Sequence, residues 1–103
     1  MTAWKADAVP RYDKRRKKLS PAIRKTLNDE QAKIIQDPYR GDRKKGNLSV
    51  IWVLKFKAEN DQYLLAYTID EKAETITFWD IGHHENFYRD LDRYRGERQE
   101  PGA

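Results

Sequence analysis

The clearest pattern in the chain is an alternation with a period of two that begins at Leu48. One set of alternate positions is entirely apolar: Leu48, Val50, Trp52, Leu54 and Phe56. The intervening set is Ser49, Ile51, Val53, Lys55 and Lys57. Successive side chains of a strand point to opposite faces, so we predict a strand with the first set in the core. Lys55 and Lys57 are then expected to point together, away from the core.

Two further strands are predicted after this one, at residues 63–69 and 75–81. The intervening segments, Glu59–Asp61 and Asp70–Ala73, are polar and short enough to be turns. Short turns can only join strands that run in opposite directions. The pattern therefore predicts an antiparallel meander of three strands.

The N-terminal half predicts a short edge strand at residues 2–9 and then two helices. Pro10 suits the first turn of a basic helix that runs to about Lys18. Ser20 and Pro21 are typical of a helix start, and the residue before a proline avoids the helical region, so Asp37–Pro38 ends the second helix. Its apolar residues recur at helical spacing: Ile23, Leu27, Ile34 and Ile35. The polar segment 39–47 is predicted to be a loop.

The last part of the chain becomes helical from Glu85, with apolar residues at Phe87, Leu91 and Tyr94, and ends at Gly96. Residues 97–103 are expected to be a flexible tail. We therefore predict an α+β fold in a single domain, residues 1–103. A small antiparallel sheet, the meander plus the N-terminal edge strand, packs on a helical hairpin, and a C-terminal helix follows. The other face of the sheet is expected to be partly open.

Composition narrows the class of protein. The 103 residues are 37% charged and 38% hydrophobic, which predicts a modest core under a highly charged surface. The chain has no cysteine, which excludes a disulfide framework and is compatible with the cytosol. We see no signal peptide and no apolar run of membrane-spanning length, so a soluble cytoplasmic protein is expected.

Positive charge is concentrated in two short segments. The net charge is +4, and ten of the 21 basic residues lie in these segments: Arg11, Lys14, Arg15, Arg16, Lys17 and Lys18, then Arg40, Arg43, Lys44 and Lys45. Such clusters are compatible with a solvated helix face and a solvated loop. In a small basic protein they favour contact with nucleic acid. Six of them are candidate phosphate ligands: Arg15, Lys18, Arg40, Arg43, Lys44 and Lys45.

Both histidines of the chain, His83 and His84, follow Gly82 at the end of the third predicted strand. Histidine gains or loses a proton near neutral pH, so the pair is a candidate for proton transfer. The turn is also compatible with a simple polar connection between strand and helix. We expect no metal and no cofactor, because adjacent histidines on a turn diverge and Glu85 alone is a poor third ligand.

The order of elements and four segments resemble one family. The segments are Ile34-Ile-Gln-Asp-Pro-Tyr39, the strand ending in Lys55-Phe-Lys57, Tyr63-Leu-Leu-Ala-Tyr-Thr-Ile-Asp70 and Ile81-Gly-His-His-Glu-Asn-Phe-Tyr88. Together they resemble the RelE/ParE superfamily of toxins from bacterial type II toxin–antitoxin systems, over nearly the whole chain. RelE-like members cut mRNA in the ribosomal A site, whereas ParE-like members poison DNA gyrase.

The resemblance also implies roles for individual residues. RelE-like nucleases carry lysines where Lys55 and Lys57 stand, a basic residue near His83 or His84, and a tyrosine at Tyr88. They often have an arginine at the position of Leu64, where this chain departs from the pattern. The lysines are equally compatible with charged residues that protect an exposed strand from aggregation. Tyr88 is also compatible with a place in the core.

These residue types suit metal-independent cleavage of RNA. A base must remove the proton of the 2′-OH, cations must neutralise the phosphate, and an acid must protonate the leaving oxygen. We predict that His84 is the acid or base, with His83 as the alternative, that Lys55 and Lys57 hold the phosphate, and that Tyr88 positions the RNA. Two lysines close together on one face also favour each other's neutral form, so one of them is an alternative candidate for the base.

The sequence thus predicts the toxin of a type II toxin–antitoxin system, acting as a ribosome-dependent endoribonuclease. The alternatives are a ParE-like gyrase poison and a non-catalytic RNA- or protein-binding module on the same fold. The resemblance implies a cognate antitoxin, the ribosome and mRNA as partners. Operator DNA is expected to bind only through the antitoxin complex, and no membrane partner is expected.

Overall fold

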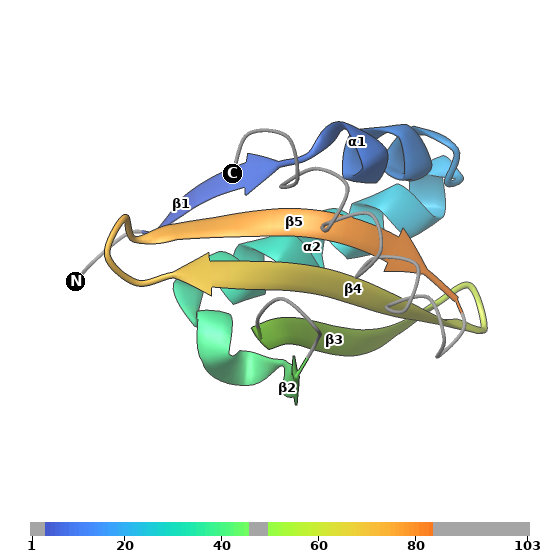
Figure 1. Ribbon diagram of the computed structural model, residues 1–103. Helices are drawn as coiled ribbons and strands as arrows, with labels where there is room; N and C mark the ends of the chain where they lie inside the picture. The colour runs from blue at the N-terminus through green and yellow to red at the C-terminus, as the bar shows by residue number, and fades with distance from the viewer. Residues whose placement is uncertain (1–3, 46–49, 84–103) are drawn as a thin grey trace.

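A five-stranded sheet with two helices forms the described part of the protein, residues 4–45 and 50–83 of a computed structural model (Figure 1). The strand order is β1-β5-β4-β3-β2. The elements are β1 (Lys5–Ala8), α1 (Pro10–Lys17), α2 (Pro21–Gln36), the 3-10 helix η1 (Pro38–Arg40), β2 (Asp42–Lys45), β3 (Val50–Ala58), β4 (Asp61–Asp70) and β5 (Thr75–Gly82). Helix α2 covers one face of the sheet, and α1 lies beside β5.

The two predicted helices are confirmed almost to the residue. Pro10 and Pro21 occupy the first turns of α1 and α2. The Ser20 hydroxyl accepts a hydrogen bond from the Ile23 N–H at 3.4 Å, which caps α2 as its sequence predicts. Leu27 and Ile34 on α2 are fully buried against the sheet. The predicted C-terminal helix from Glu85 and the tail at 97–103 lie outside the described residues.

The meander of β3, β4 and β5 is antiparallel, as predicted. The predicted edge strand is also present as β1, but it pairs with β5 in parallel, with Lys5 opposite Thr75 and Ala8 opposite Phe78. The sheet is therefore mixed, and the prediction of an antiparallel sheet was wrong in this respect. No short turn joins β1 to β5, so nothing local forces these two strands to run in opposite directions.

The predicted loop at residues 39–47 was also wrong, because it contains most of η1 and the whole of β2. Strand β2 pairs antiparallel with β3, with Asp42 opposite Val53 and Lys45 opposite Val50. Its sequence, Asp-Arg-Lys-Lys, has no apolar alternation. A strand at the edge of a sheet can carry charged residues throughout, and charge there also discourages pairing with other chains.

Apolar residues are buried on both faces of the sheet. The main cluster, between the sheet and α2, includes Leu65, Tyr67 and Phe78. A second cluster on the opposite face consists of Ile51, Val53, Leu64 and Ala66, with Trp79 packed against it. The prediction that the set with Trp52 forms the core face was thus incomplete, because Ile51 and Val53 of the other set are buried as well. The run Val50–Leu54 is apolar at every position, which is typical of a strand buried on both sides.

Tyr67 fastens the segment that leads into β2. Its hydroxyl donates to the Pro38 carbonyl at 2.7 Å and accepts from the Gly41 N–H at 3.1 Å. A Cβ atom at Gly41 would lie only 2.6 Å from that hydroxyl oxygen, so the position has no room for a side chain. Burial raises the pKa of Tyr67 to about 12. The edge strand is therefore anchored by a hydroxyl that belongs to the main cluster.

An extra residue interrupts the pairing of β4 and β5. Ala66 pairs with Asp80 and Tyr67 with Phe78, so Trp79 is the additional residue that β5 carries at this point, as in a β-bulge. The Trp79 indole nitrogen donates to the Thr68 hydroxyl at 2.9 Å. Trp79 thereby packs against the second cluster, and Asp80 shares a face with Ala66.

Candidate nucleic-acid interface

The pairing of β3, β4 and β5 arranges two rows of residues across the sheet. One row is Val53, Ala66 and Asp80, and the other is Lys55, Leu64 and Gly82. Residues directly opposite each other on neighbouring strands share a face. Lys55 and Asp80 therefore lie on the same face, the one that carries the second cluster, and we call it the cationic face.

Lys55 and Lys57 point together on this face, as the alternation predicts. Both are exposed, whereas Phe56 between them is buried in the main cluster on the other side. Leu64, opposite Lys55, is only 3% exposed. The lysines thus stand at the border of a buried apolar floor, which contributes no charge of its own.

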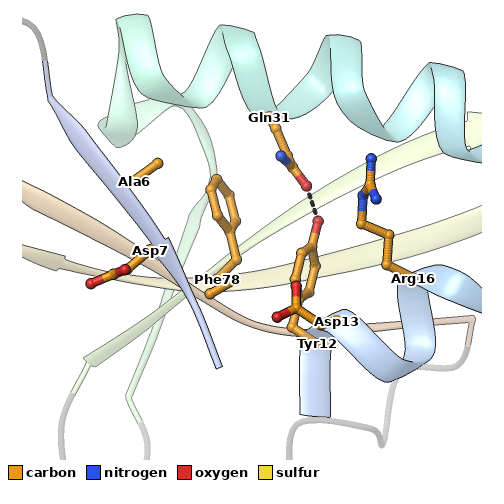
Figure 2. Close-up of a pocket in the computed structure, with 8 residues that line it drawn as sticks. Ala6, Asp7, Tyr12, Asp13, Arg16, Gln31 and Phe78 are labelled. Carbon is orange, nitrogen blue, oxygen red and sulfur yellow. Dashed lines mark hydrogen bonds between the residues drawn. The ribbon is translucent and has the colours of Figure 1, made fainter. Parts of the chain in front are cut away.

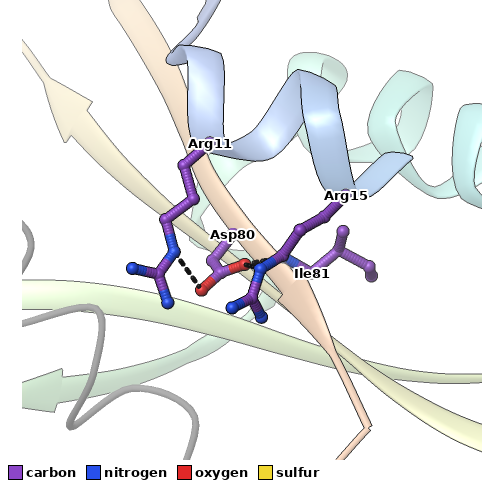
Figure 3. A network of polar contacts seen from close by, with 4 residues as sticks. All are labelled: Arg11, Arg15, Asp80 and Ile81. Atoms are coloured by element: carbon purple, nitrogen blue, oxygen red, sulfur yellow. Dashed lines mark hydrogen bonds and ion pairs between the residues drawn. The ribbon is translucent and has the colours of Figure 1, made fainter. Parts of the chain in front are cut away.

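Asp80 is completely buried, and two arginines of α1 contact it (Figure 3). The Arg11 Nε lies 3.1 Å from Oδ2 and the Arg15 Nε lies 3.3 Å from Oδ1. The Ile81 N–H also donates to Oδ1, at 2.9 Å. Burial raises the pKa of Asp80, and the two guanidinium groups and the Ile81 N–H oppose this effect only in part. The network joins α1 to β5 and brings two arginines to the cationic face.

The outer side of α1 adds further cations. Pro10, Arg11, Lys14, Arg15 and Lys18 line a shallow hollow of about 350 Å³. Arg11, Arg15 and Lys18 recur at helical spacing and therefore share one side of the helix. This places the predicted phosphate ligands Arg15 and Lys18 together.

A second hollow, of about 380 Å³, lies between β1, α1 and α2 (Figure 2). Asp7, Asp13, Arg16 and Phe78 are among the residues that line it, and the Asp7 carboxylate points away from it on the other side of β1. The Tyr12 hydroxyl donates to the Gln31 side-chain oxygen there, and burial raises the pKa of Tyr12. This hollow contains none of the predicted site residues.

The second basic segment does not form one patch. Arg40 is exposed on η1, and Arg43 and Lys44 lie on β2. Arg43 pairs with Trp52, which belongs to the side of α2, whereas Lys44 pairs with Ile51 on the cationic face. Lys45 ends β2 opposite Val50. Alternation along the strand thus separates residues that the sequence groups together.

His83 and the two lysines lie on opposite faces of the sheet. The His83 ring centroid is 4.8 Å from that of Tyr63, and Tyr63 stacks on Phe56 in the main cluster. Lys55 and Lys57 flank Phe56 and point the other way. The fold therefore does not bring His83 next to Lys55 and Lys57, which are predicted to hold the phosphate. His84 and Tyr88 lie outside the described residues.

Sequence reasoning missed Arg11 and Asp80 as members of a site. Two signals were available: Arg11 and Arg15 are four residues apart on a predicted helix, and Asp80 is a single acidic residue among Trp79 and Ile81 in an apolar strand. Within residues 4–45 and 50–83, no three histidine, aspartate or glutamate side chains gather in a way that could hold a metal ion. The same residues include no helix long and apolar enough to cross a membrane.

The fold is that of the RelE toxins. A mutant of the E. coli toxin RelE in the free state superposes with a TM-score of 0.70 at 16% identity, over 94% of this chain and 98% of that one. The toxin–antitoxin complex RelBE2 from Mycobacterium tuberculosis gives 0.70 at 18% identity, over 81% of this chain and all of that one (100%). The intact E. coli RelBE complex gives 0.65 at 20% identity, over 81% and 99%.

The family is shown by sequence. The model of the ParE-like toxins of type II bacterial toxin–antitoxin systems matches residues 7–92, and the chain belongs to this family. The predicted membership of the RelE/ParE superfamily is thus confirmed. No curated protein matches the chain.

Proposed function

We propose that this toxin stops translation by cutting mRNA on the ribosome. The observation that carries the proposal is the cationic face, on which Lys55 and Lys57 of β3 and the two arginines at Asp80 lie over one sheet. Cations fixed in this way neutralise the charge that grows on a phosphate during attack by the 2′-OH. RelE toxins share the fold, which favours an endoribonuclease.

The reaction also needs an acid and a base, in addition to the cations that neutralise the phosphate. His83 contacts Tyr63 on the opposite face, so we assign the role of acid or base to His84, the next residue in the chain. Histidine suits the role because its pKa lies near neutral pH. Tyr88 is proposed to position the RNA.

A cognate antitoxin is the second partner that we propose. Two of the similar structures are complexes of a toxin with its antitoxin. An acidic segment of an antitoxin would cover the cationic face and so block access to RNA. The toxin would act in the cytoplasm, where ribosomes are found.

The test is induced expression of the chain without its antitoxin, with labelled amino acids and thymidine followed in parallel. We expect protein synthesis to stop first, with mRNA cut inside translated regions. Lys55→Gln with Lys57→Gln should remove the arrest. The control, Lys25→Gln with Lys72→Gln, removes equal charge from exposed positions on α2 and the β4–β5 turn and should retain it. Unchanged mRNA in arrested cells would contradict the proposal.

A gyrase poison is the second candidate. Two observations favour it: the matching family is named for ParE, and Leu64 stands where nuclease relatives often have an arginine. In that case DNA synthesis would stop before protein synthesis, and the lysine variants would leave mRNA intact as the parent does.

A further inference from the structure

The arrangement of Arg11, Asp80 and Arg15 goes beyond a simple ion pair. Two arginines one helical turn apart share one carboxylate, and each contacts it through Nε. Figure 3 shows the two guanidinium groups on either side of the Asp80 carboxylate, each reaching it from α1. Both guanidinium groups are therefore anchored to one buried carboxylate through Nε.

Asp80 is fixed independently of the arginines. It is 0% exposed, and its Oδ1 also accepts a hydrogen bond from the backbone of Ile81. The side chains of Arg11 and Arg15 are 20% and 44% exposed. An arginine already held in position loses less conformational freedom when it binds an anion, and its planar fork matches the oxygens of a phosphate.

The two arginines lie on the same face of the sheet as Lys55 and Lys57, at a distance that one RNA strand could span. Asp80 lies two strands from β3, or about 10 Å at the usual spacing of strands. Lys14 and Lys18 continue the positive charge around the hollow beside Arg11 and Arg15. Between the two groups, β4 presents Leu64 and Ala66, which are buried and uncharged.

We propose that Arg11 and Arg15, oriented by the buried carboxylate of Asp80, form a phosphate clamp for single-stranded RNA. This inference rests on the proposed function in taking RNA as the substrate. It assigns Asp80 as a positioning residue and the two arginines as direct ligands.

The first test measures binding of a fluorescein-labelled single-stranded oligouridine of twelve nucleotides at several salt concentrations. Arg11→Gln with Arg15→Gln should weaken binding and reduce the salt slope of log affinity by about 1.4, because each phosphate contact on a single strand contributes about 0.7. Lys25→Gln with Lys72→Gln loses the same charge elsewhere and should reduce the slope much less.

Asp80→Asn separates a positioning role from simple electrostatics. The substitution keeps the shape and an acceptor for Ile81 but makes the protein more positive by one charge. Electrostatics alone predicts tighter RNA binding, whereas loss of the clamp predicts weaker binding. Thermal unfolding of each variant shows whether the fold is intact, and Asp80→Glu, which keeps the charge, should restore part of the affinity.

Some outcomes would overturn the clamp. They are tighter or equal RNA binding by folded Asp80→Asn, an arginine variant that behaves like the lysine control, or no binding of the oligouridine by the parent chain. Binding of polyglutamate as tight as that of RNA, with the same dependence on the arginines, would assign the surface to a protein partner instead. Cleavage of mRNA on ribosomes is measured separately. If the parent cleaves and the clamp variants cleave equally well, the proposed function stands and the clamp falls.

Discussion

The two faces of the sheet have opposite chemistry. The face under α2 buries large aromatic and aliphatic side chains, among them Tyr67, Phe78 and Leu27. The cationic face buries a smaller group, Ile51, Val53, Leu64 and Ala66, and also Asp80, the one fully buried charge in the described part of the chain. The contrast indicates that the first face supplies most of the stability and the second positions charge. Substitutions on the two faces should therefore affect different properties.

The largest expected effect on stability is that of Leu27→Ala. Leu27 is fully buried between α2 and the sheet, and truncation of such a leucine costs about 2–5 kcal/mol. Urea unfolding should show this loss, while RNA affinity, measured where the variant is folded, should stay unchanged. A variant with normal stability and weak RNA binding would reverse the roles that we assign to the two faces.

Gly41→Ala tests how the main cluster anchors the edge strand. The added methyl group would meet the Tyr67 hydroxyl at 2.6 Å, and such overpacking costs about 1–3 kcal/mol. Tyr67→Phe removes the hydroxyl and with it the hydrogen bond to the Pro38 carbonyl. This loss should lower the free energy of unfolding by about 1–2 kcal/mol.

The double variant shows whether the two changes act through the same contact. It should lose less free energy of unfolding than the sum of the two single losses, because the clash and the hydroxyl disappear together. Strict additivity in chemical unfolding would indicate that the hydroxyl does not limit the space at Gly41.

Alkaline pH should lower the stability of the protein through Tyr67, which lies in the main cluster under α2. Tyr67 has a pKa of about 12 when folded and about 10 when unfolded, so the folded state holds the proton more tightly. The contribution of the Tyr67 proton to the free energy of unfolding is complete below pH 10. It is lost as the pH rises toward 12, at up to about 1.4 kcal/mol per pH unit. Unfolding of Tyr67→Phe should depend less steeply on pH in this range. Equal slopes would contradict the assignment.

The smallest expected effect on stability is that of Lys55→Gln with Lys57→Gln. Both side chains are exposed, and surface substitutions usually change stability by less than about 0.5 kcal/mol. Thermal and urea unfolding should therefore match the parent, although toxicity is lost. A marked loss of stability would mean that the lysines support the second cluster.

The elements that follow from local signals were predicted well. Ser20 and Pro21 begin α2, Asp37 and Pro38 end it, and the period of two gives β3 and the direction of Lys55. Features that depend on distant partners were not predicted. They include β2, whose charged residues hide its pairing with β3, and the parallel pairing of β1 with β5.

The candidate site divides in the same way. Alternation alone places Lys55 and Lys57 on one face, but it does not say that His83 turns to Tyr63 on the other. The contact of Arg11 with Asp80 joins residues 69 positions apart, and no local pattern encodes such a pair. Family resemblance gives positions for candidate residues, whereas the sheet decides which of them meet.

The extra residue at Trp79 acts as a phase shift within β5. Before it, Ile76 and Phe78 are two residues apart and both face α2. After it, Ile81 faces the same side although it lies three residues beyond Phe78. With unbroken alternation, the carboxylate of Asp80 would fall inside the aromatic core instead of under α1. A single inserted residue thus converts a position that would be a buried defect into an anchor for two arginines. If β5 is aligned without a gap to a relative that lacks this extra residue, every position after Trp79 is assigned to the wrong face of the sheet.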